Sequence, residues 1–159
     1  MMISQSAQLI RKLSCIAVLA LVAGGCSSQA TPRAAPVATT ADHAVTIALQ
    51  QVGVPYRYGG STPSGFDCSG LVHYSYSRAG KIVPRTTATL WSDIRPIDTG
   101  QMRKGDILFF RIAGKMSHVG MYIGRGQFVH APSSGKVVSV ASLHSDFYSQ
   151  ALIRAGRPE

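Results

Sequence analysis

The hydrophobic pattern of this 159-residue chain changes near residue 100, and this change limits its possible folds more than any other feature. Before residue 95, apolar side chains recur at the spacing of an α-helix. After residue 105, they form short runs rich in β-branched and aromatic residues, separated by Gly, Pro and Ser. Helices followed by strands predict an α+β domain in which helices pack on one face of a mainly antiparallel sheet.

Three helices are expected before the change of period. The first has Asp42 as its N-cap and ends before Gly53. Its apolar stripe consists of Val45, Ala48, Leu49 and Val52. The second begins after Asp67, a favourable N-cap residue, and ends near Ala79. A third, shorter helix is expected over residues 86–94.

Five strands are expected after it, each bounded by turn-forming residues. They cover residues 106–110, 118–123, 127–130, 137–140 and 151–155. The sequence has no internal repeat, so it predicts one such domain, over residues 41–159.

The first residues of the chain are interpreted as an export signal. The apolar run from Leu13 to Ala23 follows Arg11 and Lys12, and it is long enough for a signal-peptide core but too short to cross a bilayer. Residues 1–25 are therefore predicted to be a signal peptide.

Cys26 follows two glycines, and this context resembles the lipobox of bacterial lipoprotein precursors. The resemblance implies that Cys26 is lipidated and anchors the protein to a membrane. Because Ser27 rather than Asp follows it, the resemblance favours the outer membrane, facing the periplasm. Residues 26–40, rich in Ala, Pro, Thr and Ser, are expected to be a flexible tether. The alternative is ordinary cleavage that leaves Cys26 unmodified.

The composition excludes several classes of protein. An apolar fraction of 45% with only 14% charged residues is typical of a globular chain and not of a disordered polyelectrolyte. Three cysteines without paired spacing support neither a disulfide scaffold nor a zinc ribbon. The formal charge of +9 suits anionic lipid or an acidic wall polymer. Nucleic acid is not an expected partner, because no Arg/Lys-rich helix or interleaved aromatic pattern is present.

Cys68 is expected to be the only thiol of the folded domain, since Cys15 would leave with the signal peptide and Cys26 would carry lipid. The first turn of a helix offers unpaired N–H groups and the positive end of the helix dipole, which stabilise a thiolate. Helical spacing places Cys68 on the stripe that faces the sheet. It is therefore either a reactive nucleophile or a small, inert core residue.

Two histidines are expected to be neighbours on a hairpin. Residues 124–126 form a turn between strands, and reflecting the chain about Arg125 pairs residue 130 with residue 120. His118 shares a strand face with residue 120, so His118 and His130 become diagonal cross-strand neighbours. With Cys68 opposite, they would supply a nucleophile, a base and a group that orients the base.

Other interpretations of these histidines remain open at this point. Each could have a hydrogen-bonded structural role, and a Cys/His/His zinc site is the other alternative. No metal is expected, because no close ligand pair such as C-x-x-C or H-x-x-x-H is present. His43, His73 and His144 have no comparable setting and are interpreted as surface or structural residues.

Six segments, in order, resemble motifs of the NlpC/P60 family of bacterial cell-wall cysteine peptidases. They are Tyr56-Arg-Tyr-Gly-Gly, Phe66-Asp-Cys-Ser-Gly-Leu-Val, Pro84-Arg-Thr-Thr, Lys104-Gly-Asp-Ile-Leu-Phe-Phe, His118-Val-Gly-Met-Tyr-Ile-Gly and Phe128-Val-His-Ala. The resemblance covers residues 42–157 and implies a compact papain-like α+β fold.

The resemblance also implies roles for individual residues. Cys68 would be the nucleophile, His118 the general base and acid, and His130 the orienting residue. Tyr56 would line the site and donate toward the oxyanion. The positions that match the family's substrate groove are Asp67, Ser69 and Arg85. No cofactor is implied.

The implied activity is hydrolysis of amide bonds in peptidoglycan stem peptides or crosslinks, either D-Ala–diaminopimelate or D-Glu–diaminopimelate. Within the family the chain most resembles the lipoprotein murein endopeptidases of the Spr kind, and a monomer is expected. Two alternatives remain: a non-catalytic peptidoglycan-binding lipoprotein with the same fold, and a papain-like acyltransferase that uses an amine or alcohol instead of water.

Overall fold

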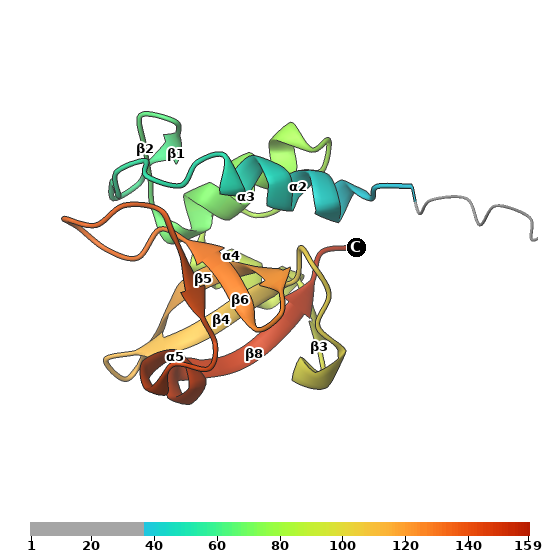
Figure 1. The fold of residues 1–159 in the computed structure, drawn as a ribbon, viewed down its shortest axis with the longest axis vertical. Helices are drawn as coiled ribbons and strands as arrows, with labels where there is room; N and C mark the ends of the chain where they lie inside the picture. The colour runs from blue at the N-terminus through green and yellow to red at the C-terminus, as the bar shows by residue number, and fades with distance from the viewer. Residues whose placement is uncertain (1–36) are drawn as a thin grey trace, which may run out of the picture. The chain divides into compact units, whose positions relative to one another are not determined.

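The computed structural model describes residues 37–159, which are built around a six-stranded sheet (Figure 1). A separate two-stranded sheet pairs β1 (Ser61–Thr62) with β2 (Gly65–Phe66). The signal peptide, Cys26 and most of the tether are predictions that lie outside the described residues. Helix α2 (Thr40–Leu49) begins one residue before the predicted start of the domain at residue 41.

The sheet has the strand order β3-β8-β4-β5-β6-β7, and each neighbouring pair is antiparallel. The strands are β3 Arg95–Ile97, β4 Ile107–Ile112, β5 Lys115–Gly124, β6 Gln127–His130, β7 Ser139–Ser142 and β8 Leu152–Arg157. Strands β4 to β8 correspond to the five predicted strands. The antiparallel α+β architecture is therefore confirmed.

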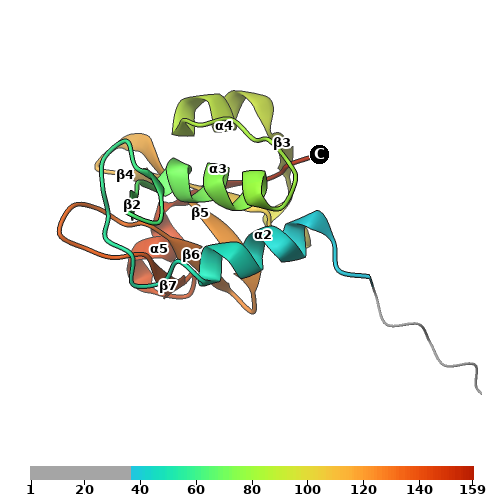
Figure 2. The ribbon, with the colours of Figure 1, turned by 90° about the horizontal axis from the view of Figure 1, so that it is seen from above.

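Three helices cover one face of this sheet. Figure 2 shows α3 (Cys68–Arg78) between α2 and α4 (Thr87–Asp93). The bounds of α3 and α4 agree with the predicted second and third helices. A fourth helix, α5 (Asp146–Ala151), lies on the opposite face and was not predicted, so the expectation of helices on one face alone was wrong.

The core consists of two hydrophobic clusters, one on each face of the sheet. Alternate residues of β4 point to opposite faces, as in any strand. Ile107 and Phe109 therefore join the helices α2, α3 and α4, whereas Leu108 and Phe110 join α5. Burial on both faces explains why the first four residues of β4, Ile107–Phe110, form an unbroken apolar run rather than an alternating one.

The start of α2 differs from the prediction. Thr39, not Asp42, is the N-cap: its hydroxyl accepts from the Asp42 amide at 3.2 Å, and the Asp42 carboxylate accepts from the Thr39 amide at 2.9 Å. The helix then ends at Leu49, before the predicted stripe is complete. Leu49 and Val52 are 38% and 49% exposed, so only the first half of that stripe is buried.

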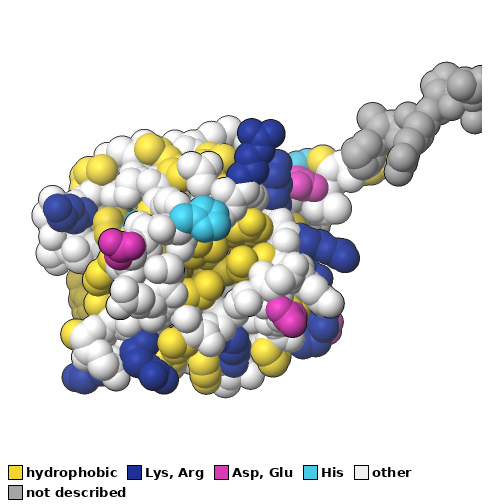
Figure 3. Space-filling view, turned by 60° about the horizontal axis from the view of Figure 1, so that its bottom comes forward, with side chains coloured by type: hydrophobic (Ala, Val, Ile, Leu, Met, Phe, Trp, Pro, Cys, Tyr) yellow, Lys and Arg dark blue, Asp and Glu magenta, His cyan; other side chains and the backbone are white. Residues whose placement is uncertain are grey.

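The surface has no single dominant charged region on the face drawn in Figure 3. Hydrophobic side chains gather in the middle of this face, and Lys and Arg side chains lie apart around its rim. Within residues 37–159, no helix is both long and apolar enough to cross a membrane.

Candidate active site

Cys68 is the first residue of α3, as predicted. Asp67 caps this helix by accepting a hydrogen bond from the Gly70 amide at 2.6 Å. The Cys68 side chain is a free, partly exposed thiol that packs against the core cluster on the helix side of the sheet. The sequence therefore places a thiol at a helix start, where backbone N–H groups are unpaired.

A glycine allows a loop to cross close to this helix start. A Cβ at Gly70 would lie 2.0 Å from the carbonyl oxygen of Gly60, which a side chain could not tolerate. The same oxygen accepts a hydrogen bond from the Asp67 amide at 3.0 Å. The absence of a side chain at Gly70 therefore allows the 59–60 loop to lie against α3, where it forms one wall of the site.

His118 and His130 are neighbours, as the predicted register requires. Nε2 of His118 lies 2.8 Å from Nδ1 of His130, and the two rings meet edge to face. The ladder pairs Met121 with Val129, which extends to residue 120 opposite residue 130. The pairing of β4 with β5 shifts by one residue at Ser117, just before His118. Such bulges re-aim side chains near functional sites.

Both imidazoles are almost completely buried, with exposed fractions of 4% for His118 and 2% for His130. Burial, together with the adjacent His130, lowers the pKa of His118 to about 3. Burial likewise lowers the pKa of His130 to about 4. Both rings are therefore neutral at neutral pH, and one donates an N–H to the other.

Aromatic rings hold the imidazole pair from the α5 side of the sheet. Phe110 packs against His118 at a centroid distance of 5.9 Å, and Phe128 packs against His130 at 4.9 Å. Tyr148 of α5 meets the His130 ring at right angles, and its hydroxyl lies 3.5 Å from Nε2 of His130. Both nitrogens of His130 thus have polar neighbours.

The structure brings the sulfur of Cys68 next to the strand that carries His118, but not into contact with the ring. Sγ lies 4.0 Å from the carbonyl oxygen of Ser117 and 3.7 Å from Oγ1 of Thr87. Across residues 37–159, no hydrogen bond joins this sulfur to an imidazole. Direct contact between Cys68 and His118 therefore stays a prediction.

The three residues assigned to the substrate groove lie together. Arg85 donates to both carboxylate oxygens of Asp67, at 2.9 and 2.8 Å, and to the Ser69 hydroxyl at 3.1 Å. It also donates to the Gly60 carbonyl at 3.1 Å. These groups form most of their hydrogen bonds with one another. Their clearest effect is therefore to fix the positions of Asp67, Ser69 and Arg85 along the predicted substrate groove.

These residues line a cleft of about 440 Å³ together with Tyr56, Cys68, Thr87 and Ser117. Burial raises the pKa of the Tyr56 hydroxyl, and negative charge at Cys68 and at Asp67 raises it further. Tyr56 therefore keeps its proton and is available as a hydrogen-bond donor in the cleft that contains Cys68. The side chains of Asp67 and Arg85 form an ion pair, so the charges they bring to the cleft cancel.

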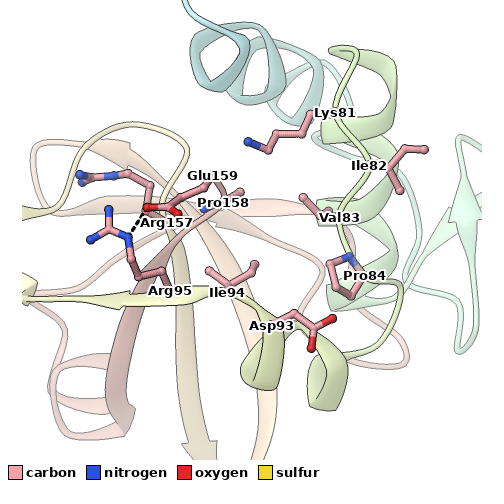
Figure 4. Close-up of a pocket in the computed structure, with 10 residues that line it drawn as sticks. All are labelled: Lys81, Ile82, Val83, Pro84, Asp93, Ile94, Arg95, Arg157, Pro158 and Glu159. Carbon is pink, nitrogen blue, oxygen red and sulfur yellow. Dashed lines mark ion pairs between the residues drawn. The ribbon is translucent and has the colours of Figure 1, made fainter.

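A second pocket, of about 190 Å³, contains none of the predicted site residues. It lies between the loop after α3 and the end of β8, where Arg95 pairs with Glu159 (Figure 4). Its other lining residues include Lys81, Val83 and Pro84. The cleft at Cys68 is the candidate site because it is the one that contains the predicted residues Tyr56, Cys68 and Arg85.

A model of the NlpC/P60 family matches residues 53–157, which include the cleft and both histidines. The chain belongs to the NlpC/P60 family.

Relatives in this family agree with that assignment. Murein DD-endopeptidase MepH of Escherichia coli (strain K12) is 42% identical over 115 residues, which cover 69% of this chain and 42% of MepH. The match thus spans less than half the length of that relative.

Solved structures of the family have the same fold. An NlpC/P60 family protein from Bacillus cereus ATCC 10987 superposes with a TM-score of 0.69 at 32% identity, covering 74% of this chain and 39% of that one. The NlpC/p60 domain of the peptidoglycan hydrolase SagA superposes with a TM-score of 0.65 at 34% identity, covering 74% of this chain and 98% of the domain.

Three residues near Cys68 and the two buried histidines were not predicted as site residues. Thr87 and Ser117 contact the sulfur, and Tyr148 contacts His130. Thr87 lies in the Pro-Arg-Thr-Thr motif, so the motif itself could have drawn attention to it. Tyr148 could be found only by predicting α5, whose signal is Ser145 as N-cap.

The remaining histidines have the settings that the sequence suggested. Nδ1 of His73 lies 2.7 Å from the Val83 carbonyl oxygen, which gives it a structural role, and His43 and His144 are exposed. In the part of the chain that the structure describes, no three His, Cys, Asp or Glu side chains are grouped as metal ligands would be.

Proposed function

We propose that this chain is a peptidoglycan endopeptidase that hydrolyses an amide bond through the thiol of Cys68. Membership of the NlpC/P60 family and the functions of MepH, a murein DD-endopeptidase, and SagA, a peptidoglycan hydrolase, support the reaction. The observation that carries the proposal is a free thiol at a helix start, in an open cleft, beside the strand of a buried imidazole pair.

His118 is the proposed base. Its Nε2 faces His130, so Nδ1 is the nitrogen left to receive the thiol proton. For Nδ1 to be unprotonated in the neutral ring, Nε2 must carry the hydrogen and donate it to His130. His130 thereby selects the useful tautomer of His118. The proposed proton transfer requires the Cys68 sulfur to leave the Ser117 carbonyl and approach Nδ1 of His118.

The thiolate then attacks the carbonyl carbon of the substrate, and an oxyanion forms. The Cys68 amide at the start of α3 and the Tyr56 hydroxyl are the proposed donors to it. One such donor typically lowers the activation barrier by about 3 kcal/mol. His118 next protonates the leaving amine and activates water, which hydrolyses the thioester.

The proposed scissile bond is the D-Ala–diaminopimelate crosslink, because MepH is named a DD-endopeptidase. The D-Glu–diaminopimelate bond of the stem peptide is the other proposed candidate. Mass spectrometry of fragments released from defined crosslinked muropeptides separates them: cleavage of the crosslink yields two monomers, whereas stem cleavage shortens a monomer.

Purified sacculi provide the test of function. The wild-type chain should release soluble muropeptides, and Cys68→Ala should release none while keeping its unfolding transition. Binding of both forms without release would instead identify a non-catalytic wall-binding protein. Products joined to an added amine would identify an acyltransferase.

We also propose that the chain is a monomer anchored through a lipid on Cys26 at the outer membrane, facing the periplasm. The apolar run before Cys26 supports this. Mass spectrometry of the mature N-terminal peptide should detect acyl groups on Cys26, and Cys26→Ser should move the protein from the membrane fraction to the soluble one. An unmodified Cys26 in the mature protein would contradict the anchor.

A further inference from the structure

The N-terminus of helix α4 is capped by two of its three threonines. The Thr86 hydroxyl accepts from the Thr89 amide at 3.2 Å, and the Thr89 hydroxyl accepts from the Thr86 amide at 3.3 Å. The two hydroxyls also contact each other at 2.8 Å. Both hydrogen bonds of the capping box of α4 are thus made without the side chain of Thr87.

The Thr87 side chain reaches the sulfur instead. Its Oγ1 lies 3.7 Å from Sγ of Cys68, which is hydrogen-bonding distance for sulfur. Both side chains are partly buried and line the 440 Å³ cleft. A hydroxyl that the helix does not need therefore lies against the proposed nucleophile.

The other neighbour of the sulfur indicates which atom donates. The Ser117 carbonyl oxygen, 4.0 Å from Sγ, can only accept, so it accepts a hydrogen bond from the thiol. The Thr87 hydroxyl is then free to donate to the sulfur. Once the thiol is ionised, the Ser117 carbonyl is no longer a favourable partner, whereas a donor to a full negative charge becomes more favourable.

We propose that Thr87 is a further catalytic residue of this site, whose hydroxyl donates to the Cys68 sulfur and stabilises the thiolate. The inference rests on the proposed function, since it assigns a partner to the nucleophile. In this step the S–H bond breaks, the proton passes to Nδ1 of His118, and the electron pair stays on sulfur. Thr87 keeps its own proton throughout, and the sulfur then forms the bond to the substrate carbonyl carbon.

The competing explanation is that Thr87 only shapes the cleft through its methyl group. Two substitutions separate these roles. Thr87→Val keeps the branched shape and removes the hydroxyl, whereas Thr87→Ser keeps the hydroxyl and removes the methyl group. Thr87→Ala lacks the hydroxyl without adding bulk, so it serves if the valine variant folds poorly. Thr99→Val, at an exposed position outside the cleft, is the matched control.

The decisive measurement is the alkylation rate of Cys68 by iodoacetamide at one neutral pH, followed by mass spectrometry of the peptide that contains Cys68. This small neutral reagent does not require the substrate groove. Loss of one hydrogen bond to a charged group should slow alkylation about tenfold in Thr87→Val and Thr87→Ala. Thr87→Ser should stay within about twofold of wild type, and Thr99→Val should be unchanged.

Turnover of muropeptides provides the second readout. The value of kcat should fall with the alkylation rate in the two hydroxyl-free variants, and KM should change little. Wild-type alkylation rates in both of these variants, a loss confined to KM, or failure of Thr87→Ser to restore the rate would overturn the proposal. If the wild type hydrolyses nothing, the proposed function fails, but the alkylation series still tests the contact.

Discussion

Single residues: the imidazole pair depends on the absence of a side chain at residue 120. A Cβ at Gly120 would lie 2.5 Å from Cδ2 of Phe128, the ring that packs against His130. Gly120 follows His118 by two residues, so it faces the same side of β5. The Gly in the His-Val-Gly motif therefore makes room for the packing that holds both histidines.

Gly120→Ala should displace Phe128 and loosen the imidazole pair. Overpacking of this kind costs about 1–3 kcal/mol, and turnover should fall more than the loss of stability alone explains. Urea unfolding and muropeptide release measure the two effects. Gly100→Ala is the control, because a Cβ there would approach only an exposed carboxylate oxygen of Asp98 at 3.3 Å. Unchanged stability and activity in Gly120→Ala would contradict this role.

The sequence could predict some contacts of the site but not others. The neighbouring positions of His118 and His130 follow from strand alternation and the turn at Arg125, which are local. The contacts of Cys68 with Thr87 and Ser117 depend on how α3, α4 and β5 pack. No periodicity in the sequence reports such packing, so these contacts required the structure.

At the level of secondary-structure elements, the position of α4 depends on an arginine of β8, a strand that lies far from α4 in the sequence. The guanidinium of Arg154 donates to the Trp91 carbonyl at 2.6 Å and to the Ile94 carbonyl at 3.0 Å, at the end of α4. It also lies 4.0 Å from the Trp91 ring centroid and 4.7 Å from that of Phe109. Because Thr87 begins the same helix, Arg154 indirectly positions one wall of the cleft.

Arg154→Met should free the end of α4 while keeping an apolar chain between the rings. Loss of the charged hydrogen bonds and the cation–π contact should reduce the free energy of unfolding by about 2 kcal/mol. Chemical denaturation measures this change. The exposed Arg111→Met should shift it by less than about 0.5 kcal/mol. Equal stability of the two variants would show that α4 does not depend on Arg154.

Elements with clear end signals were predicted well. The cap at Asp67 and the Thr-rich start of α4 gave bounds within a residue of those observed. Strand β3 and helix α5 are only three and six residues long, so they lack enough residues to show a period. β3 is held by its pairing with β8, and α5 is held by its packing on the sheet.

Whole molecule: burial of two neutral histidines makes the stability of the fold dependent on pH. The pKa values of His118 and His130 fall to about 3 and about 4, below the ordinary value of 6.5. At pH values between the lowered pKa of each folded-state histidine and the ordinary value of 6.5, the unfolded chain binds more protons than the folded one. The contribution of the pair is therefore complete above about pH 6.5 and is lost as the pH falls through about 4 for His130 and about 3 for His118.

The free energy of unfolding should thus decrease on acidification from pH 7 to pH 5, by up to about 1.4 kcal/mol per pH unit for each histidine below pH 6.5. Urea denaturation at a series of pH values measures the slope. His130→Gln should reduce it by roughly half, whereas the exposed His43→Asn should leave it unchanged. A flat profile for the wild type would mean that the histidines are not buried as neutral groups.

The identity of the nucleophile is tested most directly by trapping the covalent intermediate. The wild-type chain is mixed with a defined crosslinked muropeptide, quenched in acid after a fraction of a turnover, and digested for mass spectrometry. The peptide that contains Cys68 should carry the mass of the substrate's acyl portion, and the adduct should disappear with hydroxylamine. Hydrolysis of the same muropeptide at the wild-type rate by Cys68→Ala, without any adduct, would contradict the account.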